Sequence, residues 1–522
     1  MTVEEAVDLA IRNICLEGLT DIFRCPCELQ YFKNAEAATK VFQRIVANLK
    51  KHNFKDLGCE YLSHVLVPKS SLQYDYRRAA LLSPGCTISY LALTLLAAEK
   101  IEQKRIPVAQ HVVFSYRFAP HGDQLFSDEG GYNKWREEIV RRRTSGRCRV
   151  VVKCDLAAFY DRVNLHRLQS TLESIGIERW ISTTLNDLLL YWSRKDSYGL
   201  PIGGNASRIL AEAVLIDIDD YLCSEGIEFV RYVDDFRLFA PNLVTAQKWL
   251  GMLTARLFGQ GLLLNASKTH FYAATAVERE EVPAPDSAER ILEDFIAKSG
   301  KYRTIPRLYK KPSTEKFEAF KIVDIPTEIS NLEEAPIAEF SSIQKILIAI
   351  LAKQEFTNLS KIDFFLMRCV YSVDYVIDML QKNSQDIPED VRRDITSNLE
   401  RLLNSAFFRN LDWYEYKIIC LLGTDPYFSK RALINYVRDA TRETSPLSTL
   451  TALELLFDRV TRTDALTIRE WYDRCGEWEK RRIMKIVASS MPTEEAKAWF
   501  RSIRANVGLN FITDVAYSLN TP

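Results

Sequence analysis

Glycine is distributed unevenly along the 522 residues of this chain. Sixteen of the nineteen glycines lie at or before Gly300, and only Gly423, Gly476 and Gly508 follow. The stretch after Gly300 is instead rich in apolar residues at helical spacing. The two parts of the chain are therefore expected to differ in fold.

The C-terminal part carries the clearest helical pattern. In "PEDVRRDITSNLERLLNS" the side chains of Ile395, Leu399, Leu402 and Leu403 fall on one stripe. Segments of the same kind follow, separated by short breaks such as "TDPYFS" and "SMPTEE". The pattern predicts a stack of helix pairs of the α-solenoid kind, although no strict repeating motif occurs.

The N-terminal part mixes two kinds of periodicity. "LALTLLAAEKIEQK" and "SRILAEAVLIDIDDYL" predict helices, whereas "RCRVVVKCDLAAFY" and "IEFVRYVDDFRLFA" predict strands. The charged, proline-containing stretch "EREEVPAPDSAER" suits a connector to the helical part.

Two adjacent aspartates, Asp234 and Asp235, interrupt the apolar stretch "FVRYVDDFRLFA". A tight turn between two strands is one explanation, because aspartate favours turns. A metal site is the other, because a divalent ion neutralises carboxylates that would repel each other in an apolar interior. Asp155, at the end of the strand predicted for "VVVKCD", could complete such a site. A second aspartate pair, Asp219 and Asp220, lies near a predicted helix end and is expected to be structural.

Four sequence blocks surround these aspartates in a fixed order. "DLAAFYDRV" comes first, followed by "GLPIGGNASRILAE", "RYVDDFRLFA" and "GLLLNASKTHFY". In this order they resemble motifs A to D of the reverse transcriptase palm. The resemblance implies an α+β fold of palm and fingers and a metal-dependent DNA polymerase of the reverse transcriptase type.

The resemblance also implies roles for single residues. Asp155, Asp234 and Asp235 are expected to be catalytic and to hold two Mg²⁺ ions, with Mn²⁺ as an alternative. Tyr160 resembles the aromatic gate that rejects a ribose 2′-hydroxyl, which implies dNTPs as substrates.

Five further residues are expected to bind nucleotide. Lys268 resembles the lysine near the leaving pyrophosphate, and Gly203 either allows close approach of a nucleotide or shapes a turn. Upstream, "VLVPKSSLQYDYRRAALLSPG" resembles the finger motifs, so Lys69, Arg77 and Arg78 are candidates for triphosphate contacts.

Departures from the general reverse transcriptase pattern point to one class within the family. Intron and retroviral enzymes usually carry Pro-Gln-Gly where this chain has Pro201, Ile202 and Gly203. That block, with "FSYRFAP" and "GGYNKWREE", resembles the bacterial abortive-infection reverse transcriptases of the AbiK type and their prophage-encoded relatives. The implied organisation is a reverse transcriptase-like domain over 1–275, a connector over 276–300 and an all-α HEAT-like repeat domain over 301–522.

This narrower resemblance implies unusual chemistry. Such proteins act in anti-phage abortive infection, form homo-oligomers, and make DNA without a nucleic-acid primer or template. The strand grows from a protein hydroxyl, so the DNA product would be covalently attached to the protein. The sequence does not single out the priming residue, and Tyr31 is one candidate among 23 tyrosines.

Two other functions remain open. The chain could be a conventional RNA-templated reverse transcriptase of a retroelement. It could also be a scaffold or sensor whose helical repeats bind a phage or host protein, although Asp155, Asp234, Asp235 and Lys268 argue against a decayed palm.

Cysteine use and hydropathy bear on the location. The eleven cysteines are scattered and contain no CxxC pair, which favours reduced thiols and a cytoplasmic protein. The N-terminus "MTVEEAVDLAIRN" has no signal-peptide pattern, and no apolar run reaches membrane-spanning length. No membrane association is expected.

Overall fold

The computed structural model divides into two compact units. The sheet unit comprises Met1–Leu62 and Leu82–Glu278, and the helical unit comprises Ser63–Leu81 and Arg279–Pro522. Each unit is described by itself. The described residues are 1–24, 26–52, 55, 59–70, 73–127, 131–194, 196–275, 309, 311–312, 314–408, 411–440, 445–507 and 510–522. The predicted connector at 276–300 lies outside them.

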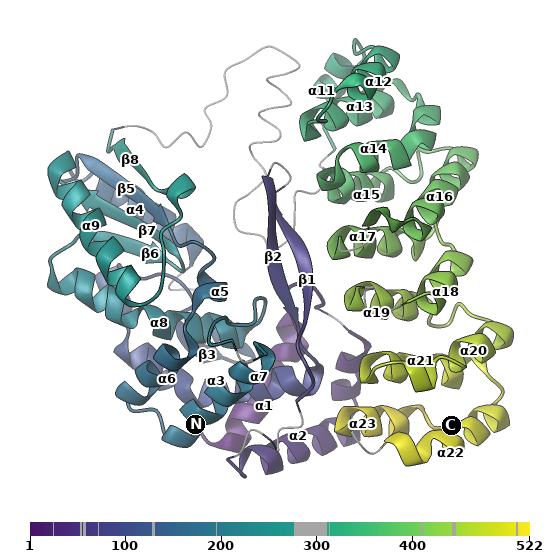
Figure 1. Cartoon of the computed structure of the whole chain (residues 1–522), viewed down its shortest axis with the longest axis horizontal. Coiled ribbons are helices and arrows are strands. Elements are labelled where there is room, and N and C mark those ends of the chain that lie inside the picture. Colours follow the sequence, from purple (N-terminus) through teal and green to yellow (C-terminus); the bar gives the residue numbers. More distant parts are fainter. Residues whose placement is uncertain are drawn as a thin grey trace. The chain divides into compact units, whose positions relative to one another are not determined.

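A four-stranded antiparallel sheet lies at the centre of the sheet unit, in the order β6-β7-β5-β8 (Figure 1). Its strands are β5 (Val150–Asp155), β6 (Phe229–Tyr232), β7 (Asp235–Ala240) and β8 (His270–Ala273). Valine and phenylalanine dominate the inner pair β5 and β7, as expected for a pleated surface buried by neighbouring elements. Helices α4 (Tyr132–Arg143) and α9 (Leu243–Gly259) both pack against this sheet.

The core beneath α4 shows how helix and sheet are joined. Trp135 and Ile139 of α4 cluster with Val151 of β5, Val230 of β6 and Phe239 of β7, all of them buried. Burial of such large apolar side chains is the main stabilising contribution to this contact.

Two long helices confirm the helices predicted in the N-terminal part. Helix α3 (Pro84–Lys104) is buried along most of its length, as its lack of charged residues before Glu99 indicates. It packs against α8 (Asn205–Ser224), which follows the glycine pair of the second sequence block. The remaining elements of the sheet unit are α1 (Val3–Glu17), η1 (Cys27–Lys33), α2 (Ala35–Leu49), η3 (Val108–Gln110), β3 (Phe118–His121), β4 (Gln124–Phe126), α5 (Phe159–Arg162), α6 (Leu165–Ser174), α7 (Arg179–Trp192) and η4 (Ala266–Lys268).

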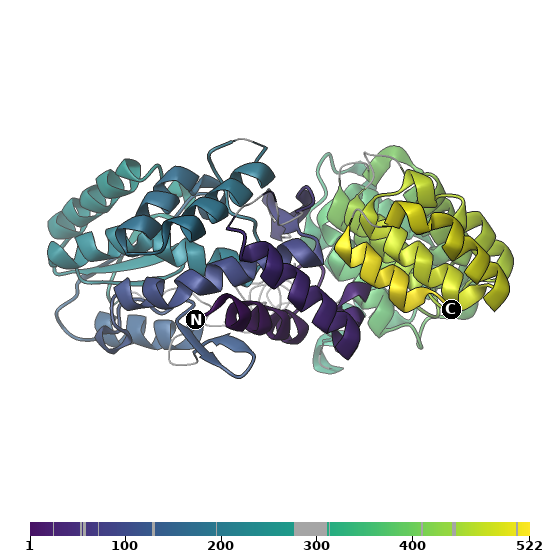
Figure 2. The same ribbon diagram turned by 90° about the horizontal axis from the view of Figure 1, so that it is seen from below.

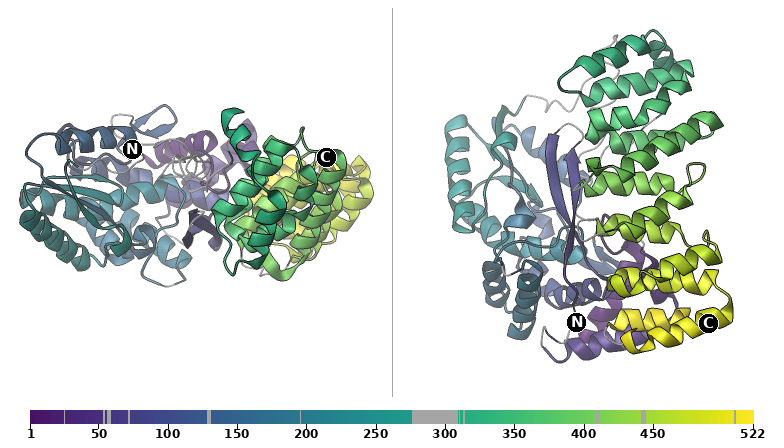
Figure 3. Two further views of the ribbon diagram at one scale, coloured as in Figure 1. Left: turned by 90° about the horizontal axis from the view of Figure 1, so that it is seen from above. Right: turned by 45° about the vertical axis from the view of Figure 1, so that its right-hand side comes forward.

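The helical unit consists of one β-hairpin and a long series of helices (Figures 2 and 3). Its helices are α11 (Thr314–Phe320), α12 (Ile325–Glu334), α13 (Phe340–Lys353), η5 (Phe356–Lys361), α14 (Ile362–Arg368), η6 (Val370–Ser372), α15 (Val373–Lys382), α16 (Glu389–Asn404), η7 (Ala406–Phe408), α17 (Asp412–Leu422), α18 (Lys430–Arg438), α19 (Pro446–Leu455), α20 (Arg462–Arg469), η8 (Tyr472–Arg474), α21 (Glu477–Ser490), α22 (Thr493–Val507) and α23 (Phe511–Asn520).

Alternate helices of this series pack side by side. Helix α15 contacts α17, which contacts α19, and the row continues through α21 to α23. Helices α14, α16 and α18 form a second row. The prediction of a helical C-terminal part is thus confirmed, whereas the assignment of these helices to HEAT-like repeats stays a prediction.

The hairpin of the helical unit is formed by β1 (Ser63–Ser70) and β2 (Gln73–Leu81). The backbone amide of Leu66 donates to Asp412 Oδ2 of α17 at 3.1 Å. The Tyr76 ring of β2 lies 6.4 Å from the ring of Tyr371, centroid to centroid. This N-terminal segment is therefore an integral part of the helical unit.

Candidate metal and nucleotide site

Strand register brings two of the three predicted aspartates face to face. In the antiparallel pair of β5 and β7, Asp155 lies directly opposite Asp235. Asp234 occupies the turn between β6 and β7, where its carbonyl accepts a hydrogen bond from the Leu156 amide at 3.1 Å. One carboxylate oxygen from each aspartate lies within 4.8 Å of the others, and we call this group the aspartate cluster.

The turn that carries Asp234 has a strained backbone. Val233 has φ +54°, a left-handed conformation that β-branched residues rarely adopt. The stretch "FVRYVDDFRLFA" is therefore two strands joined by a tight turn, which is one of the two explanations that the sequence left open. The turn and the cluster of carboxylates occur together, so the two explanations of the aspartate pair do not exclude each other.

The charges in the aspartate cluster are only partly balanced by neighbouring cations, Lys268 beside Asp155 and Arg237 beside Asp235. Burial and the Asp155 and Asp235 carboxylates raise the pKa of Asp234 to about 7. Burial, together with Asp155, raises the pKa of Asp235 to about 6 even though Arg237 opposes the shift. Burial and mutual repulsion disfavour the ionised forms of these carboxylates. A cation bound between them would stabilise the ionised forms.

The donor set fits a hard divalent cation. Asp235 Oδ2 is buried and has no hydrogen-bond partner among the described residues, although a buried carboxylate oxygen normally has one. All three ligands offered by the aspartate cluster are carboxylate oxygens, which Mg²⁺ and Mn²⁺ prefer. The residues present therefore suit divalent ions.

Two residues of the fourth block reach Asp155. Lys268, at the end of η4, places Nζ 3.0 Å from Asp155 Oδ2 while its side chain stays 57% exposed. Asn265 donates from Nδ2 to the same oxygen at 3.3 Å, and its backbone amide donates to the Asp155 carbonyl at 2.7 Å. The structure thus brings Lys268 to the aspartate cluster, and the sequence had not singled out Asn265.

Tyr160 lies on the short helix α5, directly after β5 and its turn. Burial raises the pKa of the Tyr160 hydroxyl well above its ordinary value, and the nearby Tyr116 and Asp234 add to the shift. Arg208 of α8 opposes this rise in the pKa of Tyr160. The Arg208 guanidinium lies 5.4 Å from the centre of the Tyr116 ring. Tyr160 and the aspartate cluster therefore belong to one electrostatic environment.

Sequence reasoning missed Arg208 and Tyr116. Both lie in stretches quoted above, "GLPIGGNASRILAE" and "FSYRFAP", but spacing alone does not show that they meet. Arg208 Nη2 donates to both oxygens of Asp21, at 3.0 and 3.2 Å. The N-terminal segment is thereby tied to helix α8.

Gly203 needs its glycine for backbone reasons. Its φ is +118°, and a Cβ atom there would lie 3.5 Å from the Asp21 amide nitrogen. The Gly203 carbonyl accepts a hydrogen bond from that amide at 3.0 Å. This geometry agrees with the turn-shaping alternative, and a nucleotide contact for Gly203 stays a prediction.

The predicted finger residues lie on the hairpin of the helical unit. Lys69 is on β1, and Arg77 and Arg78 are on β2, where Arg77 pairs with Val67. Lys69 and Arg78 are exposed and Arg77 is partly buried. Their role as triphosphate contacts stays a prediction.

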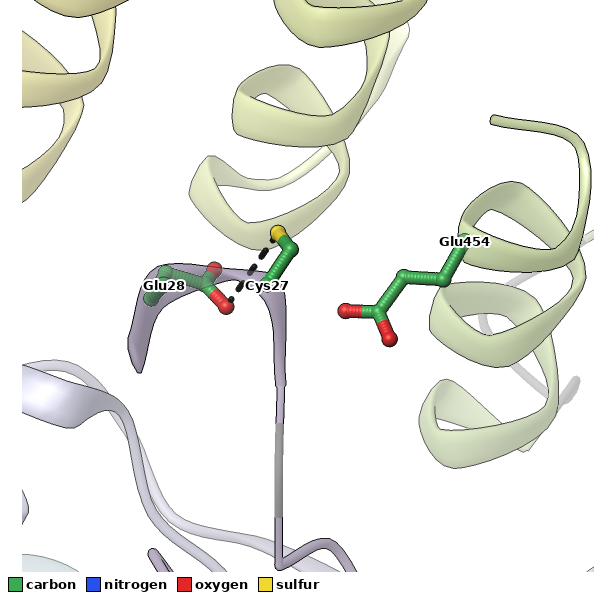
Figure 4. Close-up of side chains that lie close together, drawn as sticks. All are labelled: Cys27, Glu28 and Glu454. Carbon is green, nitrogen blue, oxygen red and sulfur yellow. Dashed lines mark hydrogen bonds between the residues drawn. The ribbon is translucent and has the colours of Figure 1, made fainter. Parts of the chain in front are cut away.

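Tyr31, the priming candidate, lies in η1 and its side chain is only 5% exposed. In the same element Cys27 Sγ donates to Glu28 Oε2 at 3.6 Å (Figure 4). Glu454, also drawn there, belongs to the helical unit, where it accepts from Arg482 Nη2 at 2.6 Å. A priming role for Tyr31 stays a prediction.

The second aspartate pair has a different environment. Asp219 is buried in α8, and its two oxygens accept from Arg231 Nε and Nη2 at 2.8 and 2.5 Å. Its neighbour Asp220 is exposed. Asp219 is thus a partner in an ion pair, in agreement with the structural role expected from the sequence.

Comparison with known proteins identifies the segment that contains this site. Residues 87–310 match the family model described as "Reverse transcriptase (RNA-dependent DNA polymerase)". This segment is similar to reverse transcriptase domains. It includes the aspartate cluster, Tyr160, Gly203 and Lys268, and it begins after Lys69, Arg77 and Arg78.

A bacterial protein is also similar to part of the chain. The chain is 27% identical over 123 residues to the retron Ec86 reverse transcriptase of Escherichia coli. This match covers 23% of the chain and spans 37% of the length of that relative.

Solved structures with detectable similarity to the chain include telomerases. The telomerase of Candida albicans in complex with a TWJ fragment of telomeric RNA is 11% identical, with a TM-score of 0.30 over 75% of this chain and 66% of that one. The apo telomerase of Candida tropicalis is 10% identical, with a TM-score of 0.28 over 93% of this chain and 74% of that one.

Within the part of the chain that the structure describes, no helix combines the length and the apolar character needed to cross a membrane.

Proposed function

We propose that the chain is a divalent-metal-dependent DNA polymerase of the reverse transcriptase type that uses dNTPs. The observation that carries this proposal is the register of β5 and β7, which gathers three carboxylates inside the segment that matches the reverse transcriptase model. The unpartnered Asp235 oxygen and the raised pKa values of Asp234 and Asp235 support a metal role for the aspartate cluster.

Each residue of the site has a defined part in this proposal. The aspartate cluster binds Mg²⁺ or Mn²⁺, which in phosphoryl transfer supplies Lewis-acid stabilisation of the attacking and leaving oxygens. Lys268, exposed and next to Asp155, binds the negatively charged leaving pyrophosphate. The Tyr160 ring excludes a ribose 2′-hydroxyl, which selects dNTPs over NTPs.

We further propose that synthesis is protein-primed and independent of a template, and that it serves anti-phage abortive infection. This rests on the resemblance carried by Ile202 and the flanking blocks, together with the helical C-terminal part. A cytoplasmic location agrees with the ten described cysteines, none of which forms a disulfide. A homo-oligomer and covalently attached DNA belong to the same proposal.

One observation favours a second candidate. The matched family model is described as an RNA-dependent DNA polymerase, which supports a conventional RNA-templated enzyme. The two candidates share the aspartate cluster and differ only in what primes and directs synthesis.

A polymerisation assay separates them. Purified full-length protein is incubated with Mg²⁺ and labelled dNTPs, either alone or with an annealed RNA–DNA primer-template. Product without added nucleic acid supports protein priming, whereas product only with the primer-template supports the templated enzyme. Absence of product in both arms, with Mg²⁺ and with Mn²⁺, would contradict the polymerase proposal.

Mass spectrometry of protein purified from cells tests the priming step. We expect a covalent DNA adduct, and peptide mapping then names the attachment residue. Loss of the adduct in Tyr31→Phe would support the priming candidate. An unchanged adduct would assign priming to another residue.

The role in defence is tested by phage plating. A double variant, Asp234→Ala with Asp235→Ala, is expected to lose protection, while Asp220→Asn retains it. Full protection by the double variant would instead favour a scaffold or sensor function of the helical unit.

A further inference from the structure

A buried carboxylate that the proposed reaction does not use is linked through Arg231 to the turn of the aspartate cluster. Glu212, in the middle of α8, is 1% exposed. Its Oε2 accepts from Arg105 Nη2 at 2.8 Å and from Arg231 Nη2 at 2.9 Å, and its Oε1 accepts from Ser115 Oγ at 2.5 Å. Burial alone would raise the pKa of Glu212, but the two arginines hold it below its ordinary value. Glu212 is therefore an ionised carboxylate shared by two buried cations.

The first of these cations supports the turn of the aspartate cluster. Arg231 is fully buried on β6, and its Nη1 donates to the carbonyl of Val233 at 2.9 Å. Val233 is the strained residue immediately before Asp234. The orientation of the Arg231 guanidinium, fixed by Glu212 and Asp219, therefore bears directly on where Asp234 lies.

The second cation supports another strained turn next to the site. Arg105 donates to the carbonyls of Ser115 and Tyr116, at 2.6 and 3.0 Å. Tyr116 has φ +43°, which is unusual for an aromatic residue. Its side chain is one of the groups that raise the pKa of Tyr160. A turn held by Arg105 thus adjoins the predicted nucleotide gate.

The hydrogen bonds of Glu212 with Arg105 and Arg231 indicate a role beyond stability of the fold. A buried ion pair is on balance a weak stabiliser, because apolar packing of the same volume often does as well or better. Backbone strain of this kind persists only where the surrounding structure enforces it, and it is concentrated at functional sites. Both strained residues are held at their carbonyls by arginines that share the one carboxylate.

We infer that Glu212 is a positioning residue for metal binding: through Arg231 it fixes the turn that presents Asp234, and through Arg105 it fixes the turn beside Tyr160. The inference rests on the proposed metal role of the aspartate cluster. Glu212 contacts neither the metal nor the substrate. Its effect is transmitted by the two arginines.

Metal binding itself provides the test. The probe is Mn²⁺ titrated into full-length protein without dNTPs, with free Mn²⁺ measured by electron paramagnetic resonance. We expect Glu212→Gln, which keeps the shape and removes the charge, to weaken Mn²⁺ binding by about tenfold to a hundredfold, as is usual for partners of metal ligands. Arg231→Lys keeps the charge but loses the second donor, and is expected to weaken binding to a similar degree.

Glu138→Gln is the matched control. Glu138 is also a buried carboxylate of the sheet unit that pairs with two arginines, accepting from Arg142 Nε at 2.7 Å and from Arg141 Nε at 2.6 Å. Its loss should lower the melting temperature about as much as Glu212→Gln, but leave Mn²⁺ binding within about twofold of the wild type.

Four results would contradict the positioning role of Glu212 or the proposed function on which it rests. Mn²⁺ binding by a folded Glu212→Gln that equals that of the wild type would overturn the positioning role. Equal weakening by Glu138→Gln would reduce it to general destabilisation. Failure of both Glu212→Gln and Arg231→Lys to fold would make the network a folding requirement and also overturn the inference. If instead the wild type binds no Mn²⁺, the proposed function itself fails.

Discussion

At the scale of single residues, the carboxylates of the aspartate cluster are only partly paired with cations. Lys268 approaches Asp155, whereas Asp235 keeps a buried oxygen that no described group satisfies. Such an arrangement suits the divalent cation proposed for this site, which would complete the pairing of the carboxylates. Loss of any one carboxylate should therefore act on metal-dependent chemistry more than on folding.

The first prediction concerns these ligands. Asp155→Asn, Asp234→Asn and Asp235→Asn are each expected to reduce dNTP incorporation by at least about a thousandfold, since metal stabilisation of the transition state is worth several kcal/mol. Incorporation of labelled dNTP measures the effect. Asp220→Asn, an exposed aspartate outside the cluster, should leave it unchanged. Near-normal activity of any cluster variant would remove that residue from the metal site.

The second prediction concerns sugar selection by Tyr160. Tyr160→Ala removes the ring that is proposed to exclude a 2′-hydroxyl, so incorporation of NTPs relative to dNTPs should rise by about tenfold or more. Tyr160→Phe keeps the ring and should discriminate as the wild type does. Competition between labelled dNTP and NTP measures the ratio. Equal ratios for Tyr160→Ala and Tyr160→Phe would contradict the gate.

At the scale of secondary-structure elements, the hairpin of β1 and β2 depends on helix α17. The Asp412 carboxylate accepts a hydrogen bond from the Leu66 amide. Burial raises the pKa of Asp412, and the hydrogen bond from Leu66 opposes this shift. A hydrogen bond from a strand amide to a carboxylate at a helix start fixes the strand against that helix.

The third prediction tests this contact. Asp412→Ala is expected to destabilise docking of the hairpin by about 1 kcal/mol, the usual loss for a hydrogen bond of this type. Hydrogen exchange at residues 64–68 should become faster. Glu389→Ala is the control for loss of an acidic residue at a helix start, because Glu389 is exposed in the first turn of α16. It should leave hydrogen exchange in the hairpin unaltered. Unchanged exchange in Asp412→Ala would show that other contacts hold the hairpin.

Local sequence patterns predicted individual helices and strands better than they predicted which of them contact each other. The valine run of β5 and the apolar stripe of α16 were visible in the sequence, because their periodicity is local. A turn was one explanation of the aspartate pair, but the positive φ of Val233 was not visible, because β-branched residues rarely adopt it.

Long-range pairing was the other feature that the sequence did not reveal. The order of the four blocks placed Asp155 with Asp234 and Asp235, but it did so through resemblance to a family. Glu212 and Arg105 lie 107 positions apart in sequence. Glu212 ends the block "GLPIGGNASRILAE", but nothing in that block shows that its last residue pairs with Arg105. A buried ion pair becomes visible only once the fold is known.

At the scale of the whole molecule, several buried carboxylates make stability depend on pH. Burial raises the pKa of Glu415 in α17 to about 7, from an ordinary value of 4.5, and Asp412 adds to the shift. The folded protein therefore binds more protons than the unfolded chain between these two values. The free energy of unfolding must fall as the pH rises through this window.

The fourth prediction follows from this sign. Glu415→Gln cannot ionise, so its free energy of unfolding should exceed that of the wild type by roughly 2 kcal/mol at pH 8 and match it near pH 4. Urea unfolding at both pH values measures the difference. Glu389→Gln, at an exposed position, should show little effect at either pH. A difference that is larger at pH 4 than at pH 8 would contradict the assigned shift.

The division of the chain into units has a consequence for how the protein can be cut or recombined. The hairpin Ser63–Leu81 belongs to the helical unit, although its sequence lies inside that of the sheet unit. A truncation near residue 275 would thus delete the helices and leave their two strands behind. A single crossover between genes could not transfer the helical part intact. We expect the two units to be inherited together, and a helical fragment expressed alone to be rescued only when the hairpin is supplied.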